Sequence, residues 1–320
     1  MIDAANGSKL RATLIVIKKN LVIGGAGFIG SNLVDSLVKR GDSVTVIDDL
    51  STGSLDNVNH AAEFVQSDIS EPGIEDALAP HFEGVDTVFH LAARARVQPS
   101  IEDPVDFDKV NVGGTLRMLK LSSDHNVGKF VFSSSSSVYG EPEYTPTDEN
   151  HPKNPLSPYA ANKLIGEVYC KMFSEVYELP TVSLRYFNVY GERQPLEGAY
   201  ALVMGIFADQ ILKGKPMTIR GDGEQRRDFT YVQDVVQANV LAADSDDAGY
   251  GEVYNVGNSN NSSVNQLADL LGGERTNIDP VIEPRETLAD NTKIRNVLGW
   301  KPTMELEDWV PGWKEKIGIS

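Results

Sequence analysis

Two side chains four residues apart could carry out proton-transfer chemistry. They are Tyr159 and Lys163, in the stretch Ser157-Pro158-Tyr159-Ala160-Ala161-Asn162-Lys163. Proline suits the first turn of a helix, so a helix is expected to begin at Pro158, and residues i and i+4 share one face of it. A free tyrosine has a pKa of about 10, but a neighbouring ammonium stabilises the phenolate and lowers that pKa. The pair therefore indicates a tyrosine that acts as a general base, although an isolated pair of this kind is usually ordinary helix surface.

A run of five serines, residues 133–137, is the second candidate for chemistry. Serine tracts normally form flexible linkers. Here the apolar residues 130–132 precede the run and Val138-Tyr139-Gly140 follows it, as at the junction of a buried strand and a packed loop. From the residues alone, the tract is either filler or part of a site.

Strands and helices must position these side chains, and their patterns alternate over roughly the first 190 residues. The strands that we predict from apolar, β-branched runs are 18–23, 43–48, 63–66, 87–92, 129–133 and 181–186. The helical patterns between them include 28–40, 104–126 and 158–178. This alternation indicates an α/β fold with a doubly wound parallel sheet. Ligands of such sheets bind beyond the carboxyl ends of the strands, where the serine run lies.

Glycines join the first predicted strand to the first predicted helix in Gly24-Gly25-Ala26-Gly27-Phe28-Ile29-Gly30. The stretch fits GxGxxG from Gly25 and GxxGxxG from Gly24. Glycines let the backbone turn tightly and approach a pyrophosphate, whose charge then meets the helix N-terminus. A glycine turn can be purely structural, but the strand before it and the helix after it are the context of a dinucleotide-binding (Rossmann) site.

The second predicted strand ends in Asp48, about 20 residues beyond the glycines. A carboxylate there accepts hydrogen bonds from the adenosine ribose and repels the additional phosphate of NADP, so we predict NAD as the cofactor. The alternative is an aspartate solvated in a turn. Asp68 and Ile69, after the third strand, are candidates to frame the adenine.

The alternation becomes less regular beyond residue 188. The elements expected there are two helices and a strand, at 200–213, 232–243 and 252–256. We predict three regions: an N-terminal extension at 1–17, a Rossmann domain at 18–188 to which the chain returns near 229–257, and a smaller, mainly substrate-binding α/β lobe at 189–320.

The composition excludes several classes of protein. Lys and Arg total 29 against 46 Asp and Glu, for a net charge of -17, which disfavours nucleic-acid and anionic-membrane partners. The single cysteine, Cys170, excludes an internal disulfide and a cysteine-rich metal site, and no metal is expected. The longest apolar stretch near the N-terminus is ATLIVI, far shorter than the roughly 20 residues of a membrane span. We expect a cytoplasmic protein.

Together these motifs resemble those of the extended short-chain dehydrogenase/reductases, and specifically of the nucleotide-sugar epimerases and dehydratases. The resemblance covers nearly the whole chain, from residue 18 to residue 302. Its motifs are the glycine stretch, Asp48, Asn111, Ser135, Tyr159 with Lys163, and the stretches His90-Leu91-Ala92-Ala93, Arg185-Tyr186-Phe187-Asn188-Val189-Tyr190-Gly191 and Arg227-Asp228-Phe229.

The resemblance implies a role for one serine of the tract. In this family a Ser or Thr three residues before the Val of VYG, here Ser135, hydrogen-bonds the sugar O4 and assists the tyrosine. The 4,6-dehydratases carry Asp-Glu at the next two positions and the decarboxylases carry a Glu, whereas this chain has Ser136 and Ser137. Elimination lacks its acid–base pair, so a reaction confined to C4 is implied.

The implied activity is NAD-dependent 4-epimerisation of a UDP-sugar, either UDP-GlcNAc/UDP-GalNAc or UDP-Glc/UDP-Gal or both. Tyr159 takes the O4 proton while hydride passes from C4 to NAD, and the 4-keto sugar then turns and receives hydride on its other face. Lys163 balances the phenolate charge and contacts the nicotinamide ribose. The residues expected to bind the cofactor are Gly24, Gly27, Phe28, Ile29, Gly30, Asp48, Asp68, Ile69, Leu91, Ala92, Ala93, Asn111, Tyr159, Lys163 and Tyr186.

The resemblance also implies substrate contacts beyond Ser135 and Tyr159. Asn188 and Arg227 match the family's contacts to the diphosphate. The family's Arg-x-Gly-Glu/Asp segment is absent, with Val281 at the expected arginine and Arg285 as a candidate replacement. Thr287 occupies the gatekeeper position beside the sugar's C2 substituent, where small residues admit N-acetylated sugars.

Alternatives remain open. A UDP-glucuronate 4-epimerase or another nucleotide-sugar oxidoreductase, such as a 4-keto-sugar reductase, would use the same fold, and a glucuronate enzyme needs additional donors facing C6, for which Arg94, Arg96 and Arg185 are candidates. A noncatalytic NAD-binding relative is a further alternative, which the retained Ser, Tyr and Lys oppose. By analogy with the family, helices 104–126 and 158–178 are expected to form a homodimeric four-helix interface.

Overall fold

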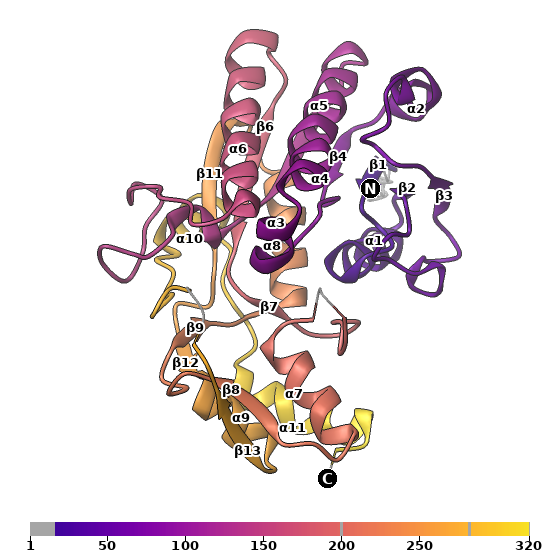
Figure 1. Ribbon diagram of the computed structural model, residues 1–320. Helices are drawn as coiled ribbons and strands as arrows, with labels where there is room; N and C mark the ends of the chain where they lie inside the picture. The colour runs from indigo at the N-terminus through magenta and orange to yellow at the C-terminus, as the bar shows by residue number, and fades with distance from the viewer. Residues whose placement is uncertain (1–16, 199–200, 281–282, 320) are drawn as a thin grey trace, which may run out of the picture.

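Seven parallel strands form the central sheet of the computed structural model, which describes residues 17–198, 201–280 and 283–319 (Figure 1). The strands are β1 (Lys19–Ile23), β2 (Ser43–Asp48), β3 (Glu63–Gln66), β4 (Thr87–His90), β5 (Lys129–Ser135), β6 (Thr181–Tyr186) and β11 (Tyr250–Val256). Their spatial order is β11-β6-β5-β4-β1-β2-β3, with every neighbouring pair parallel. The predicted doubly wound sheet is confirmed. Its order reverses between β4 and β1, which is where such sheets bind ligands.

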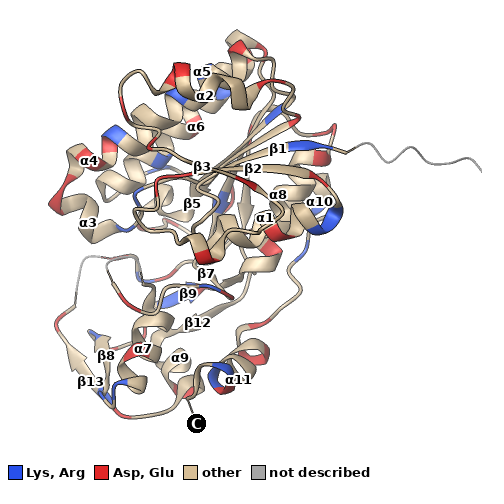
Figure 2. Ribbon diagram, turned by 90° about the vertical axis from the view of Figure 1, so that its right-hand side faces the viewer, with Lys and Arg blue, Asp and Glu red and all other residues tan. Residues whose placement is uncertain are grey.

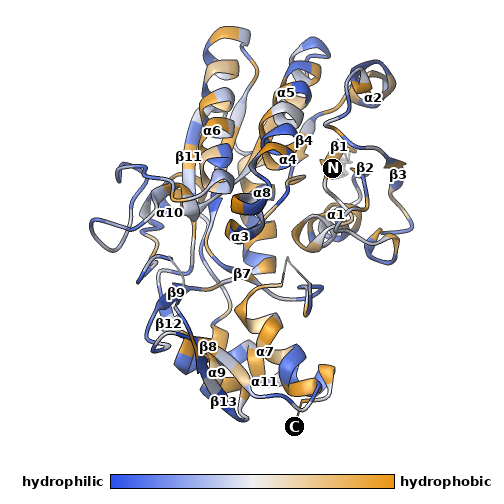
Figure 3. Cartoon of the chain, viewed as in Figure 1, coloured by the Kyte–Doolittle hydropathy of each residue, from blue (hydrophilic) through white to orange (hydrophobic). Residues whose placement is uncertain are grey.

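Helices cover both faces of this sheet, because successive residues of a strand point to opposite faces. Val22 of β1 packs in one apolar cluster with Leu33, while Leu21 packs in another with Met118. The first face carries α1 (Phe28–Arg40), α8 (Val232–Asp244) and α10 (Thr292–Leu298), and the second carries α2 (Ile74–Phe82), α5 (Thr115–Asp124) and α6 (Pro158–Tyr177). In Figure 3, α5 and α6 alternate between orange and blue, as helices that bury one face do.

The segment between β4 and β5 differs from the single helix predicted at 104–126. After α3 (Val97–Glu102), α4 (Pro104–Asp108) leads into a π-helical segment (Lys109–Gly114) and then into α5. Such wider turns occur mostly at functional sites. Gly114 allows close packing here, because a Cβ on it would lie 2.9 Å from the side chain of Ile69.

A smaller lobe lies below the sheet in Figures 1 and 2. Its main elements are α7 (Val203–Leu212), β8 (Met217–Arg220), α9 (Val264–Leu271), β13 (Arg275–Ile278) and α11 (Leu306–Ile317). Phe207, Leu267 and Trp313 belong to its separate apolar cluster. The helix predicted at 200–213 is observed from Val203, and Tyr200 lies outside the described residues. Acidic and basic residues are scattered over the helices of both parts in Figure 2.

The chain passes repeatedly between the sheet and the lobe. After β6 it enters the lobe, returns for α8 and β11, goes back for α9, returns for α10 and ends in α11. Short strand pairs, β7 with β10 and β9 with β12, lie along these crossings. They are β7 (Val189–Tyr190), β9 (Arg226–Asp228), β10 (Thr230–Tyr231) and β12 (Asn261–Ser263).

Candidate active site

A cavity of about 1400 Å³ extends along the carboxyl ends of the strands and reaches the lobe. The predicted site residues that line it are Gly24, Gly27, Phe28, Ile29, Gly30, Asp48, Asp68, Ile69, Leu91, Ala92, Ala93, Ser135, Tyr159, Lys163, Tyr186, Asn188, Arg227 and Thr287. Asn111 and Arg285 are not among the lining residues. The structure thus brings together one set of side chains from the sheet and another from the lobe.

The glycine stretch wraps closely around the start of α1. Gly24 has φ +87°, and a Cβ on it would lie 2.5 Å from the backbone nitrogen of Ala92. A Cβ on Gly30 would lie 2.1 Å from the carbonyl oxygen of Gly24. No side chain caps the N-terminus of α1 at Gly27, so its first amides are left for a ligand. This surface fits the pyrophosphate of a dinucleotide.

Asp48, at the end of β2, fixes the loops on either side of it. Its Oδ2 accepts a hydrogen bond from the Ala26 amide at 2.9 Å, and its Oδ1 accepts one from the Leu50 amide at 2.8 Å. Burial raises the pKa of this carboxyl group, against the effect of the two amides. Each carboxylate oxygen can accept further bonds, so the position fits the adenosine ribose.

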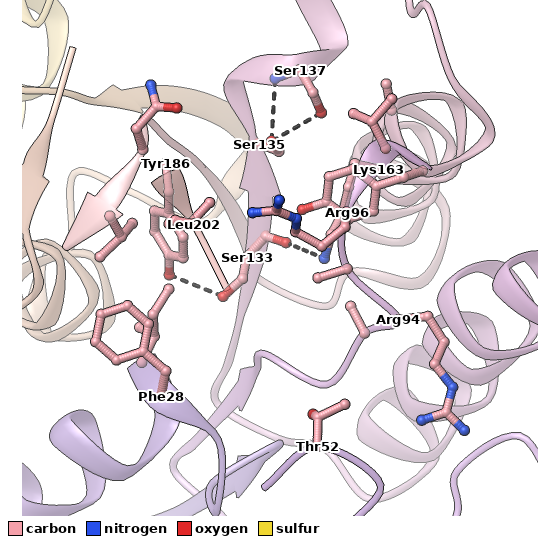
Figure 4. A pocket seen from close by; sticks show the side chains of 18 of the residues that line it. Phe28, Thr52, Arg94, Arg96, Ser133, Ser135, Ser137, Lys163, Tyr186 and Leu202 are labelled. Carbon is pink, nitrogen blue, oxygen red and sulfur yellow. Dashed lines mark hydrogen bonds between the residues drawn. The ribbon is translucent and has the colours of Figure 1, made fainter. Parts of the chain in front are cut away.

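Tyr159 and Lys163 lie where α6 and β5 meet the cavity. Ser157 caps α6 by accepting a bond from the Ala160 amide at 3.2 Å, and Pro158 occupies the first turn. Tyr159 forms a side-chain hydrogen bond with Ser135, the last residue of β5. The Lys163 ammonium donates to the carbonyl oxygen of Ser133 at 2.7 Å (Figure 4). It lies 6.0 Å from the centroid of the Tyr159 ring.

The electrostatics around Tyr159 differ from those expected for an adjacent ammonium. Burial raises the pKa of Tyr159, while the hydrogen bond with Ser135 and the positive charge of Arg96 oppose that rise. Burial lowers the pKa of Lys163 to about 8. Arg96 lines the same cavity, and its positive charge favours the ionised form of Tyr159.

The serine tract is a strand end, not a linker. The hydroxyl groups of Ser133 and Tyr186 are 2.9 Å apart, and Ser134 donates to the carboxylate of Glu167. Glu167 also forms a buried ion pair with Arg185, with Nη2 and Oε2 2.6 Å apart. Arg185 is thereby excluded as a donor to a ligand.

In the lobe, Asn188 and Thr287 lie side by side. The Asn188 amide donates to the carbonyl oxygen of Asp228 at 3.0 Å and to Thr287 Oγ1 at 3.3 Å. The Asp228 carboxylate is buried and accepts bonds from the amides of Asn258, Ser259 and Ala289. Burial raises the pKa of Asp228 to about 7. Its contacts fix the segment that carries Thr287.

The two arginines of the lobe that the sequence singled out lie in different places. Arg227 lines the cavity, and its Nη2 lies 2.7 Å from an oxygen of Glu283. Arg285 instead points to the surface, where it forms a bidentate pair with Asp222 at 2.7 and 2.9 Å. In this arrangement Arg285 is not among the residues that line the cavity, and its replacement of the missing arginine stays a prediction; Val281 lies outside the described residues.

Asn111 supports the cavity without lining it. Its side-chain oxygen accepts a bond from the Arg94 amide at 2.8 Å, and its nitrogen donates to the Arg94 carbonyl oxygen at 2.9 Å. The Arg94 side chain also pairs with Asp49 and Asp106. Asn111 therefore holds the loop after β4 and is not placed to contact the cofactor directly.

Other polar residues are structural. His90 lies between the rings of Phe130 and Phe132, and burial lowers its pKa to about 3. Cys170 is buried in the core. In the described part of the chain, no cluster of His, Cys, Asp or Glu is arranged to hold a metal ion, and no helix has the length and apolar character of a membrane span.

The fold and the site define a dinucleotide-binding enzyme of the short-chain dehydrogenase/reductase type. The family model described as "NAD dependent epimerase/dehydratase family" matches residues 20–257. The chain belongs to this family, and its cofactor is NAD.

Relatives agree with this assignment. A UDP-glucose 4-epimerase of Mycolicibacterium smegmatis is 40% identical over 305 residues, covering 91% of this chain and 96% of the relative. The solved UDP-glucose 4-epimerase of Thermotoga maritima with UDP-glucose has a TM-score of 0.87, is 38% identical and covers 93% of this chain and 99% of its own. A UDP-N-acetylglucosamine 4-epimerase of Methanobrevibacter ruminantium, in complex with UDP-N-acetylmuramic acid, has a TM-score of 0.85 at 36% identity, with 94% and 99% covered. The protein is an NAD-dependent epimerase.

Proposed function

We propose that this protein interconverts the C4 epimers of a UDP-sugar, with Tyr159 as the base. The observation that carries the proposal is the grouping of Ser135, Tyr159 and Lys163 at the wall of one cavity, beside the glycine loop that fits the dinucleotide. The solved relatives named above, an epimerase with UDP-glucose and an epimerase of UDP-N-acetylglucosamine, support a UDP-sugar as the substrate.

In the proposed reaction, the Tyr159 phenolate removes the proton from the sugar O4 and returns it after inversion. When the sugar is bound, the single hydroxyl hydrogen of Ser135 turns from Tyr159 to the same O4. NAD, which the glycine loop and Asp48 would hold, would supply reversible hydride transfer at C4, so the reaction would have no net oxidation. Lys163 holds the main chain of Ser133 and thereby the end of β5.

The residues after Ser135 support chemistry confined to C4. Ser137 donates through its amide at 3.2 Å and through its hydroxyl at 2.9 Å to Ser135 Oγ. Neither Ser136 nor Ser137 can act as a carboxylic acid at C5 or C6. Ser137 instead orients the hydroxyl of Ser135.

Both N-acetylated and plain hexoses are proposed as substrates, with Asn188 and Arg227 as contacts to the diphosphate. Thr287 lines the cavity, and its hydroxyl accepts bonds from Asn188 and from the Asp228 amide. It therefore presents to the sugar a small side chain whose two acceptor positions are filled, which leaves room for an acetamido group. We also propose a cytoplasmic location.

The first experiment incubates the purified protein with UDP-GlcNAc, without added NAD, and separates the sugar nucleotides by anion-exchange chromatography. UDP-GalNAc is the expected product, and Tyr159→Phe should form none while keeping the fold. UDP-galactose from UDP-glucose without UDP-GalNAc would keep the reaction and refute the role of Thr287. No turnover of either substrate, even with added NAD, would refute the proposal.

Turnover of UDP-glucuronate alone would favour the glucuronate alternative. Of the three candidate arginines, Arg185 is paired with Glu167, and Arg94 with Asp49 and Asp106. Arg96 lines the cavity.

A further inference from the structure

Ser133, the first residue of the serine run, joins two walls of the cavity. Its carbonyl oxygen accepts a hydrogen bond from the Lys163 ammonium at 2.7 Å, and its hydroxyl lies 2.9 Å from that of Tyr186. All three residues line the cavity. Figure 4 shows Ser133 between the other two, with Lys163 on one side of it and Tyr186 on the other. Ser133 therefore connects the helix that carries Tyr159 and Lys163 to the wall that Tyr186 forms.

The hydrogen bond between Ser133 and Tyr186 has a fixed direction. The Tyr186 hydroxyl donates its one hydrogen to Asn239 Oδ1 at 2.9 Å, so it accepts from the Ser133 hydroxyl. The Asn239 amide is itself oriented, because its nitrogen donates to the Val235 carbonyl oxygen at 2.8 Å. Burial raises the pKa of Tyr186 to about 12, which keeps its hydroxyl protonated for this bond. The chain of hydrogen bonds thus runs from β5 through β6 to α8.

The chain of hydrogen bonds is buried. Ser133 is 5% exposed, Tyr186 7% and Asn239 0%. The hydrogens of both hydroxyls are engaged within the protein, so neither hydroxyl is a free donor to a ligand in the cavity. A buried polar network in which every member is paired makes its surroundings rigid. The chain therefore fixes the hydroxyl end of the Tyr186 ring, which is part of the cavity wall.

We propose that Ser133 is a positioning residue, whose hydroxyl holds the Tyr186 ring at a fixed place relative to Tyr159 and Lys163. The inference rests on the proposed function, in which Tyr159 is the base. In that function the sugar C4 and the cofactor react beside Tyr159, between the two walls that Ser133 joins. Their reaction requires a close and well-aligned approach. The Ser133 hydroxyl acts on this approach through Tyr186, without contacting the reacting atoms.

The first test is Ser133→Ala, which removes the hydroxyl and keeps the carbonyl group that accepts from Lys163. With UDP-glucose, kcat should fall about tenfold at unchanged KM, because alignment is lost and no contact to the substrate is removed. Ser133→Thr, which keeps a hydroxyl, should restore most of kcat. Ser122→Ala is the matched control and should change neither quantity. Ser122 is also buried and donates to the Met118 carbonyl oxygen at 2.7 Å, but it is not among the lining residues.

Tyr186→Phe removes the same hydrogen bond from its other side. If Ser133 acts through Tyr186, the double variant should lose no more activity than the more impaired single variant, because one interaction is lost in all three. Multiplied losses in the double variant would indicate two independent roles and overturn the proposal. A lower thermal midpoint of Ser133→Ala with an unchanged kcat would also overturn it, since the bond would then serve stability alone.

A second readout needs no turnover. Chemical reduction of the NAD-bound protein with borohydride, in the absence of sugar, gives a fluorescent nicotinamide whose emission anisotropy reports how firmly it is held. The anisotropy should be lower in Ser133→Ala and Tyr186→Phe than in the wild type and Ser122→Ala. This result in a protein that turns over no UDP-sugar would support the inference and refute the proposed function. Unchanged anisotropy in a protein that epimerises UDP-glucose would refute the role of Ser133 and leave the proposed function intact.

Discussion

Ser134, in β5 next to Ser135, has a structural partner in Glu167, and the effect of removing Glu167 on stability can be measured. Ser134 and Arg185 both bind the Glu167 carboxylate, which is buried. Glu167→Ala should lower the free energy of unfolding by about 3–5 kcal/mol, because it leaves the buried Arg185 charge without its partner. Denaturant unfolding measures this change. Glu175→Ala, in an exposed pair with Lys171, is the control and should cost less than about 1 kcal/mol; equal losses would contradict the prediction.

Lys163 should make stability depend on pH. Its pKa is about 8 in the folded protein, against an ordinary value of about 10.5, so between these values the unfolded chain binds more protons. Stability therefore rises with pH across this window from this group alone, and the cost of the buried charge is fully present below pH 8. The measurement is the difference in unfolding free energy between wild type and Lys163→Met at several pH values. A difference that stays constant from pH 7 to about 10 would contradict the lowered pKa.

The positions of single residues in the site could be predicted where a short sequence motif determines them. The spacing of Tyr159 and Lys163 placed both at the cavity, and the glycines placed the helix N-terminus. The ion pair of Arg285 could not be read from the sequence, because its partner, Asp222, is 63 residues away in the chain. The bonds of Asn111 could not be read from the sequence either, because they are to the main chain of Arg94, 17 residues away.

At the scale of elements, the π-helical segment supports the loop after β4. Asn111→Ala removes two bonds to the Arg94 main chain, so that loop, which carries Leu91 and Arg96, should loosen. We expect less NAD to remain bound after gel filtration. Asn20→Ala is a matched control, because Asn20 is equally buried but lies at the amino end of β1, whereas the cavity lies at the carboxyl ends of the strands. Loss of NAD in both variants would indicate general destabilisation instead.

Asp228 connects β9 to two later segments of the chain. Asp228→Ala leaves the amides of Asn258, Ser259 and Ala289 without their acceptor, at a cost of about 1–3 kcal/mol for each amide that water cannot reach. The thermal midpoint should fall, and KM for the UDP-sugar should rise because the Thr287 segment loses its anchor. Asp228→Asn keeps one acceptor oxygen and should have a smaller effect on the thermal midpoint and on KM. Equal effects of the two variants would argue against a role for these hydrogen bonds in holding the Thr287 segment.

Elements with strong periodicity could be read from the sequence. The strands at 43–48, 63–66 and 181–186 are observed with the predicted bounds. The interruption of helix 104–126 was not foreseen, because one additional residue in a turn leaves the apolar pattern nearly unchanged. The strands of two to four residues in the lobe were also missed, since they are defined by partners far away in the chain.

At the scale of the molecule, an apolar surface on α6 supports a second copy of the chain as partner. Ile165, Val168, Val176 and Tyr177 are exposed on this helix, which stands beside α5 in Figure 1. We expect a homodimer through these helices, and Val168→Glu should convert it to a monomer in sedimentation experiments, because two charges would be buried at the interface. Val297→Glu, on α10, should leave the dimer intact. A monomeric wild type would refute the expectation.

The repeated passage of the chain between sheet and lobe has a consequence for protein engineering. Because β11 pairs with β6 in the central sheet and α8 and α10 cover it, a graft that replaces everything after residue 188 would also remove an edge strand and two covering helices of the recipient. The lobe therefore cannot be exchanged as one continuous segment of the chain. Transferring its specificity to another member of the family requires a mosaic gene that exchanges the lobe segments and keeps the recipient's own returning strand and helices.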